Sequence, residues 1–412
     1  MFIFVFLVFL FLYFAFAQDD AVAYAAACIM NHPVSLSPVW TSLLLTLLCF
    51  GLISGIRKLF LKVRFLAMAE YSSELELCSF GLTKSLSPRR LGLTVACVAT
   101  GWLAAAGLSL PFASALWQAG LLIVAVGMVL ADRQYNLRLL RLWGPERTLW
   151  QKFMPRAIEL LVLCLYVGAG TAVSDVEHFE LRTAQALRSD HPEEAYHIGE
   201  VDLATSPRLF AMRCYLLATH HPKGLGDKLL QQPVPAGGSD NLLLPDDERQ
   251  RLLLPADSLT RLLGCRPQRG EKATDYLRRC ALRADKARKA KKAADNAAQF
   301  RPVPAIDYYL CALLLERHLD RFAQEAARFY PQATANATLP TYYAQAMVFY
   351  ARQHTQPAVM YHDSAIEANL RDYADMEAKL PDDASRPNLL RRSYGETYWW
   401  WYEYGIAGTA QP

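Results

Sequence analysis

Two adjacent carboxylates, Asp19 and Asp20, are the residues of this chain whose type and position best suit chemistry. They directly follow an apolar run, residues 1–17, and are therefore expected at a membrane surface. A carboxylate there can act as a general base or hold a divalent metal ion beside the bilayer. Membrane glycosyltransferases that use lipid-linked sugars place an acidic residue in the first external loop, so one hypothesis is a subunit or fragment of a lipid-linked glycan transferase. The simpler interpretation is that both acids mark the aqueous end of a membrane helix.

The rest of the chain lacks the common catalytic and metal-binding motifs. Its nine cysteines include no Cys-x-x-Cys pair, and its histidines form no His-Glu-x-x-His motif. A Gly-rich phosphate loop and a Gly-x-Ser-x-Gly elbow are also missing. We therefore predict no metal site and no cofactor, name no catalytic residue beyond the weak candidates Asp19 and Asp20, and favour binding over catalysis.

A cluster of aromatic residues near the C-terminus is the best sequence evidence for a binding surface. Tyrosine and tryptophan crowd residues 398–404, and on a helix they point in all directions. The residues that we predict to contact a partner are Tyr398, Trp400, Trp401 and Tyr404. The alternative is that this short helix docks on the rest of its domain and buries its rings there.

One pair of cysteines, Cys265 and Cys280, has a spacing that suits a disulfide across a turn at Gly270. The alternative is two free thiols. A long helix is then predicted from Gly270 to about Gln299, and it is rich in Lys and Arg. Its basic face suits anionic lipid headgroups or cell-wall polymers, and the alternative is a solvated helix face without a ligand.

Five apolar runs lie within the first 174 residues. Because a helix rises 1.5 Å per residue, roughly 20 residues cross a hydrocarbon core of about 30 Å. We predict about five transmembrane helices, at 1–17, 39–56, 91–110, 115–131 and 157–174. Residues 1–17 end in small residues that also fit a cleaved signal peptide, so removal of this segment stays an alternative.

Basic residues in the short loops predict the orientation of these helices. Arg57 and Lys58 follow the second run, and Arg89 and Arg90 precede the third. Short loops rich in Lys and Arg stay in the cytoplasm. Alternation from there puts the N-terminus in the cytoplasm and residues 175–412 outside it. The predicted location is a bacterial inner (cytoplasmic) membrane, with the lipid bilayer as one partner and a periplasmic C-terminal domain.

Residues 175–412 predict an all-α, water-facing domain. Apolar residues recur at helical spacing between Pro and Gly, and Ser206 followed by Pro207 predicts a helix start. A Pro- and Gly-rich stretch at about 232–256 predicts one long loop. The 30 Lys and Arg against 31 Asp and Glu in this half argue against binding to nucleic acid. Helices joined by short Pro-marked turns favour a helix-hairpin stack of the tetratricopeptide kind.

Four segments of the second half carry a family resemblance: SPRLFAMRCYLLATHHPKGLGDKLL (206–230), IDYYLCALLLERHLDRFAQEAARFYP (306–331), LPTYYAQAMVFY (339–350) and YGETYWWWYEYG (394–405). They resemble uncharacterised multi-pass membrane proteins of Bacteroidetes that have a C-terminal, tetratricopeptide-like domain and no assigned function. Those proteins are longer, which leaves open whether Met1 is the true start. The resemblance supplies no catalytic residue. Because helix-hairpin stacks present surfaces that suit recognition, the preferred hypothesis is a scaffold that binds a protein or glycan partner in the cell envelope.

Overall fold

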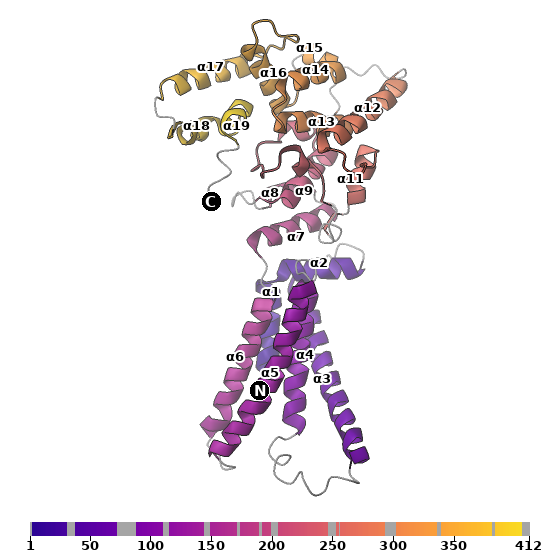
Figure 1. Ribbon diagram of the computed structural model, residues 1–412, viewed down its shortest axis with the longest axis vertical. Helices are drawn as coiled ribbons and strands as arrows, with labels where there is room; N and C mark the ends of the chain where they lie inside the picture. Colours follow the sequence, from indigo (N-terminus) through magenta and orange to yellow (C-terminus); the bar gives the residue numbers. More distant parts are fainter. Residues whose placement is uncertain are drawn as a thin grey trace. The chain divides into compact units, whose positions relative to one another are not determined.

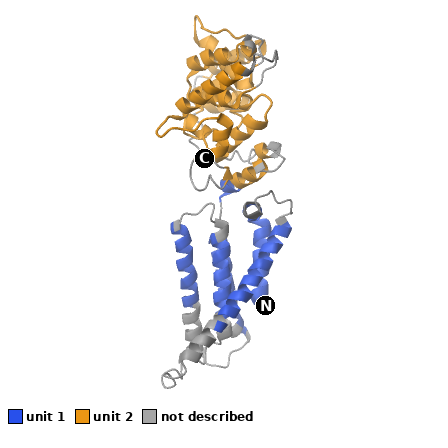
Figure 2. Ribbon diagram, turned by 90° about the vertical axis from the view of Figure 1, so that its right-hand side faces the viewer, with its two compact units in different colours: residues 1–178 blue, residues 179–412 orange. Residues whose placement is uncertain are grey.

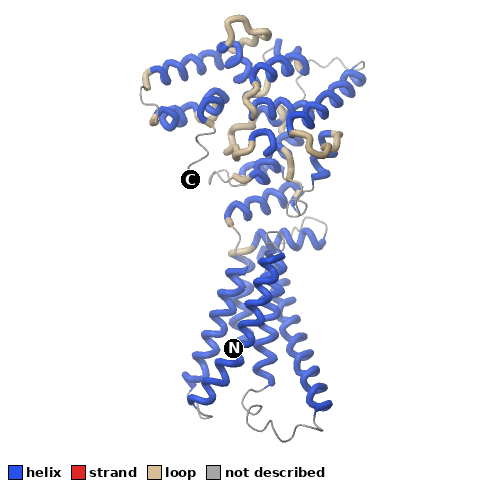
Figure 3. Tube along the Cα trace, viewed as in Figure 1, coloured by secondary structure: helices blue, strands red, loops and turns tan. Residues whose placement is uncertain are grey.

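The structure is a computed structural model of the 412-residue chain. It describes residues 2–30, 38–71, 88–109, 115–143, 149–170, 174–188, 192–198, 205–245, 253–254, 256–292, 302–335, 339–380 and 384–405. Every regular element in these ranges is helical, and Figure 3 draws no strand among them. The all-α prediction is therefore confirmed for the described part of the chain. Contacts divide the chain into two compact units, Met1–His178 (unit 1) and Phe179–Pro412 (unit 2), which Figure 2 colours separately.

Unit 1 is built from long, apolar helices (Figure 1). They are α1 (Phe2–Phe16), α2 (Asp19–Met30), α3 (Pro38–Tyr71), α4 (Pro88–Ser109), α5 (Ala115–Trp143) and α6 (Leu149–Gly170), and α7 (Asp175–Arg188) crosses from unit 1 into unit 2. Helix α2 lies between the first two predicted membrane helices, in a stretch for which no helix was predicted. Its first two residues are Asp19 and Asp20, where acidic side chains interact favourably with the helix dipole.

The interior of unit 1 is formed by faces with helical spacing. On α1, Phe6, Leu10 and Phe14 are fully buried at intervals of four residues, and α1 contacts α3 and α6. Helices α4 and α6 approach closely at Gly101, where an added Cβ would lie 3.2 Å from Leu163 and 3.3 Å from the side chain of Val167. Unit 1 thus has a tightly packed, apolar interior of its own.

The outer faces of the same helices are also apolar, the reverse of a water-soluble bundle. Leu44 and Leu48 of α3, Ile123 of α5, and Leu161 and Leu165 of α6 are all more than half exposed. Among the described residues, one helical stretch, Val39–Leu59, is long and apolar enough to cross a bilayer unaided, and a second candidate combines Arg156–Gly170 and Asp175–Leu187 across a 64° bend. The remaining apolar stretches are shorter, so five membrane spans stay a prediction.

Unit 2 consists of shorter helices. They are α8 (Pro192–His197), α9 (Pro207–His220), η1 (Leu225–Asp227), η2 (Gly238–Leu242), α11 (Ala256–Leu263), α12 (Ala273–Lys292), α13 (Pro304–Leu315), α14 (Leu319–Phe329), α15 (Pro331–Ala335), α16 (Thr341–Gln353), α17 (Ser364–Ala378), α18 (Arg386–Tyr394) and α19 (Tyr398–Tyr404). The predicted start of α9 is confirmed: Ser206 is its N-cap, and its Oγ accepts a hydrogen bond from the Leu209 amide at 3.0 Å.

Helix α13 forms the centre of unit 2. All its residues from Ala305 to Leu315 are buried, and it contacts α9, α11, α12, α14, η1 and η2. A helix that is apolar on nearly every side belongs in a core. The buried position of α13 therefore explains its composition, which is as apolar as that of the short helical stretches of unit 1. The short helix η2 interrupts the predicted loop at 232–256 and also rests on α13.

A fully buried carboxylate, Asp307, connects α13 to two other elements. Its Oδ2 accepts a hydrogen bond from the Leu225 amide at 2.5 Å, and the Gly226 amide is a further donor. The Tyr343 hydroxyl of α16 donates to Oδ1. Space is tight here, since a Cβ on Gly226 would lie 2.5 Å from the Tyr343 ring. Asp307 therefore ties η1 and α16 to the central helix.

Candidate functional site

The predicted catalytic acids lie in unit 1 and differ in their surroundings. Asp20 is 8% exposed, and its Oδ2 lies 3.4 Å from Nδ1 of His178, whereas Asp19 is half-buried. The described residues contain no group of three or more metal-ligating side chains. Asp20 thus has a partner that its sequence position did not suggest. A catalytic role for the two acids stays a prediction.

The predicted aromatic binding residues lie on α19 and are divided between the core and the surface. Tyr398 and Trp400 are buried. Trp401 is half-buried beside the guanidinium of Arg317, which lies 5.5 Å from its ring centre. The hydroxyl of Tyr404 donates to Glu377 at 2.8 Å. Only Trp401 and Tyr404 therefore offer accessible ring surface, and their binding role stays a prediction.

The strongest local charge imbalance in unit 2 lies in α11, α12 and the segment between them. Residues 261–292 carry 12 Lys and Arg against three Asp and Glu, whereas the other residues of 175–412 carry 18 against 28. The domain is neutral only as an average over two oppositely charged parts. We call the following exposed or half-exposed side chains the basic surface: Arg266, Arg269, Lys272, Arg279, Arg283 and Lys286.

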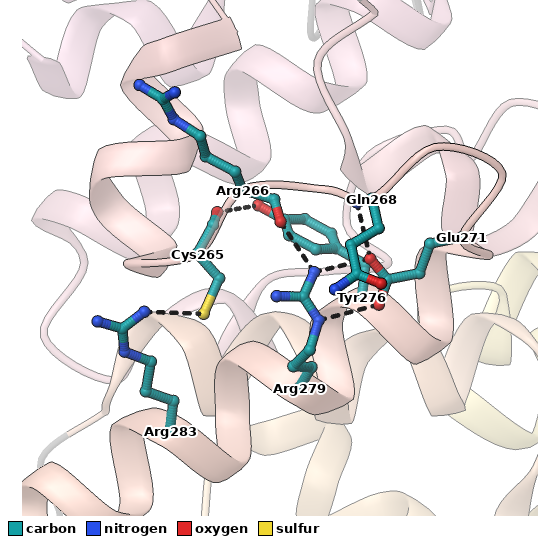
Figure 4. Close-up of polar contacts among 7 residues, drawn as sticks. All are labelled: Cys265, Arg266, Gln268, Glu271, Tyr276, Arg279 and Arg283. Atoms are coloured by element: carbon teal, nitrogen blue, oxygen red, sulfur yellow. Dashed lines mark hydrogen bonds and ion pairs between the residues drawn. The ribbon is translucent and has the colours of Figure 1, made fainter.

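Helical spacing aligns the basic surface. On α12, Arg279, Arg283 and Lys286 are separated by four and three residues and so share one face of the helix. The segment 264–272 is fixed over that face by two hydrogen bonds from α12: Tyr276 donates to the Cys265 carbonyl at 2.8 Å, and Arg279 donates to the Arg266 carbonyl at 2.8 Å. Within the segment, the Gln268 amide donates to Glu271 at 3.0 Å. Figure 4 shows these contacts converging around Arg279.

Among the described residues, nearby acids pair with one member of the basic surface, Arg279, and leave the others without a carboxylate partner. Both oxygens of Glu271 accept from Arg279, at 3.0 and 2.7 Å, and these hydrogen bonds lower the pKa of Glu271 although its partial burial opposes the shift. Asp285 is buried and pairs with Arg288 and Lys289, at 2.8 and 2.7 Å. In the described part of the chain, no carboxylate pairs with the rest of the basic surface: Arg266, Arg269, Lys272, Arg283 and Lys286.

This arrangement suits an anionic ligand in water. Guanidinium groups bind phosphate and carboxylate through two parallel hydrogen bonds, and three of the unpaired residues are arginines. A surface that inserts into lipid usually combines basic residues with exposed large apolar ones. Among the described residues of α11, α12 and 264–272, no large apolar side chain is exposed. The chemistry therefore favours a dissolved polyanion over a membrane surface.

Sequence reasoning located part of this surface and missed the rest. It placed Lys272, Arg279, Arg283 and Lys286 within one basic helix, but it did not include Arg266 or Arg269. These two arginines, and Lys272 in the structure, lie on a connecting segment whose course depends on contacts with Tyr276 and Arg279. A usable signal was present in Gly264 and Gly270, which have φ of 72° and 77° and mark the two turns that fold the segment back.

Comparisons with known proteins give one match. No curated protein and no solved structure matches the chain. The sequence model of a family of unknown function (DUF6057) matches residues 268–405, which include α12 to α19 and most of the basic surface. The match agrees with the expected resemblance to an uncharacterised family, while the tetratricopeptide-like repeat and the bacterial group stay predictions. Over residues 268–405 the chain is thus similar to a family to which no chemistry has been assigned.

Proposed function

We propose that the chain is a multi-pass protein of a bacterial inner membrane whose helical domain binds an anionic glycan of the cell envelope. The basic surface is the observation that carries the binding part of this proposal. Its side chains are held on one face by the Tyr276 and Arg279 hydrogen bonds, and five of them have no carboxylate partner in the described part of the chain. A tetratricopeptide-like stack would present such a face to a long polymer.

The membrane part of the proposal rests on the outer faces of unit 1. Side chains such as Leu44, Ile123 and Leu161 are exposed along helices whose interiors are already filled. A groove of about 1090 Å³ between α1 and α6 is lined mainly by apolar residues, including Phe9 and Leu165. Apolar surface of this kind is unfavourable in water and is matched by lipid acyl chains. We place the five predicted spans in the bilayer on this basis.

The orientation is tested by labelling with a membrane-impermeant maleimide in intact cells. The test positions are Lys62→Cys in α3 and Asp240→Cys in η2, both at exposed residues. The background carries Cys28→Ser and Cys78→Ser, and the background without an added cysteine is the control. We expect labelling at residue 240 alone, since the basic loops stay in the cytoplasm. Labelling at residue 62 alone would place the helical domain in the cytoplasm and contradict the proposal.

The binding surface is tested with a triple variant, Arg266→Gln, Lys272→Gln and Arg283→Gln, in the full chain reconstituted in neutral phosphatidylcholine nanodiscs. The probe is polygalacturonate, a carboxylate-rich glycan, and neutral dextran is its uncharged counterpart. Each exposed ion pair contributes about 0.5 kcal/mol, so we expect the three replacements together to lower affinity for the probe roughly tenfold, and we expect salt to weaken binding. Affinity is read by interferometry.

A matched triple variant controls for loss of charge in general. Arg371, Lys379 and Arg392 are exposed basic residues of α17, the turn after it and α18, outside the basic surface. Their replacement by glutamine should leave the affinity within about twofold of the parent. Equal losses of affinity in the two triple variants would mean that the probe responds to the net charge of the protein and not to the basic surface. Binding to phosphatidylglycerol vesicles without binding to polygalacturonate would contradict a glycan and indicate a lipid partner.

A further inference from the structure

Two cysteines of the basic region, Cys265 and Cys280, are brought near each other by the residues around them. Tyr276, Cys280 and Arg283 are spaced at four and three residues and lie on one face of α12. The Cys265 carbonyl accepts from Tyr276 at 2.8 Å, and the Cys265 sulfur accepts from Arg283 Nη1 at 3.9 Å (Figure 4). Cys265 is therefore held between the residues that flank Cys280, over the face of α12 that carries Cys280.

We propose that Cys265 and Cys280 form a reversible disulfide that fastens the segment 264–272 to α12. Both cysteines are reduced in this structure, and they are 5% and 0% exposed. A cysteine held over the helix face that carries its partner has a short path to bonding distance. The segment that carries Cys265 is bounded by two glycines with positive φ, Gly264 and Gly270, and has no regular secondary structure between them. This segment, and not helix α12, is therefore the part that can move to bring Cys265 to Cys280.

The reaction balances with a disulfide-bearing thiol oxidoreductase as the oxidant. The Cys265 thiol loses its proton and its sulfur attacks the oxidant, which releases one oxidant thiolate and leaves a mixed disulfide. The sulfur of Cys280 then loses its proton, attacks the Cys265 sulfur and releases the second oxidant thiolate. Two protein thiols become one disulfide, and two electrons and two protons pass to the oxidant. Cys265 is 5% exposed whereas Cys280 is fully buried, so the oxidant reaches Cys265 first.

This bond would bear directly on the proposed binding surface. Arg266, Arg269 and Lys272 lie on the fastened segment, and the other basic residues lie on α12. In the oxidised chain the disulfide would fix the basic residues of the segment in position relative to those of α12. In the reduced chain only hydrogen bonds would hold the segment there. The inference rests on the proposed function in one respect, since an extracytoplasmic domain meets an oxidising environment.

The pair itself is tested on the purified full chain in detergent, with oxidised dithiothreitol as the oxidant. We expect two thiols to disappear, a peptide carrying Cys265 to be linked to one carrying Cys280, and the melting temperature to rise by about 5–10 °C. Cys265→Ser and Cys280→Ser should each abolish all three changes. Cys214→Ser is the matched control, since Cys214 is as buried as Cys280, and it should change none of them. An unchanged thiol count, or a link between other cysteines, would overturn the inference.

Thiol trapping in cells separates this inference from the proposed location. Cells are quenched with acid, and free thiols are counted with a maleimide of known mass. We expect two fewer thiols than in a reduced sample for the parent and for Cys214→Ser, but not for Cys265→Ser. A pair that forms in the purified chain but stays reduced in cells would refute the extracytoplasmic location and leave the pair's geometry standing. A pair that fails in the purified chain refutes the inference whatever the location.

Discussion

The Asp307→Ala variant is expected to lose about 3–5 kcal/mol of unfolding free energy, enough to lower the melting temperature of unit 2 by roughly 10 °C. The reason is the set of donors that the side chain satisfies. Without the carboxylate, the amides of Leu225 and Gly226 lose their buried acceptor, and the hydroxyl of Tyr343 keeps only the backbone carbonyl of residue 307 as an acceptor there. The alanine side chain supplies no acceptor, and water has little room beside the closely packed Tyr343 ring. Thermal unfolding followed by circular dichroism measures the loss.

Two further variants make the Asp307 result interpretable. Asp307→Asn keeps an oxygen for the two amides, and its NH₂ group can donate to Tyr343, whose hydroxyl also donates to the Asp307 carbonyl at 3.0 Å. We therefore expect asparagine to cost less than alanine. Asp372→Ala removes an exposed aspartate of α17 and should change stability by less than about 0.5 kcal/mol. If Asp307→Ala were no worse than Asp372→Ala, the hydrogen bonds would not stabilise the core as argued.

The same site gives a pH dependence of stability. Burial raises the pKa of Asp307 to about 6, against the opposing effect of its hydrogen bonds. Because the folded-state pKa exceeds the unfolded value of roughly 3.9, the folded state retains a proton that the unfolded chain has lost between these pH values. This contribution to stability is fully present below about pH 4 and is lost as pH rises through about 6. Urea unfolding from pH 4 to pH 7 should show it in the parent and not in Asp307→Asn.

Asp307 also illustrates what the sequence could predict and what it could not. The helix that carries it was expected, because Ile306, Leu310 and Leu313 recur at helical spacing. An acid in the first turn of a helix ordinarily faces water and interacts with the helix dipole. Here its partners lie on η1, 82 residues earlier, and on α16, 36 residues later. Spacing within one helix carries no information about such distant donors.

The basic surface and α2 show the same division between local and distant causes. The start of α9 follows from Ser206 and Pro207, two adjacent residues whose effect is local. Helix α2 was not predicted, because Asp19 and Asp20 were considered only as acids at a membrane surface, although the alanines that follow them favour a helix. The segment 264–272 has little preference of its own. Its course depends on Arg279, which reaches back to Glu271 and Arg266, so only the folded chain unites the basic residues.

Trp399→Ala is expected to cost about 3–5 kcal/mol and to loosen α17, α18 and α19 together. The Trp399 ring is 1% exposed and lies 6.3 Å, centre to centre, from the ring of Tyr373 on α17. Tyr373 in turn lies 5.3 Å from Tyr394 of α18. Removing the indole would leave a large cavity between elements that meet through these rings. Hydrogen exchange by mass spectrometry should show faster exchange in α17 to α19, with little change in α13.

Trp401→Ala is the matched control, because it removes the same side chain from the partly exposed side of α19. Its ring lies 5.5 Å from the Arg317 guanidinium, and loss of that contact should cost about 1 kcal/mol. Trp399→Phe keeps an aromatic ring and removes an indole N–H that has no hydrogen-bond partner among the described residues. It should therefore retain most of the stability that alanine loses.

The three variants separate docking from partner binding for the aromatic cluster. Docking requires the buried ring, so it predicts a large loss for Trp399→Ala and a small one for Trp401→Ala. If the two alanine variants lost equal stability, the buried ring would have no special role in holding the three helices. Partner binding instead depends on accessible surface, which Trp401 has and Trp399 lacks. A stable Trp401→Ala variant with unchanged exchange in α17 to α19 is therefore the appropriate protein for testing whether the aromatic cluster also binds a partner.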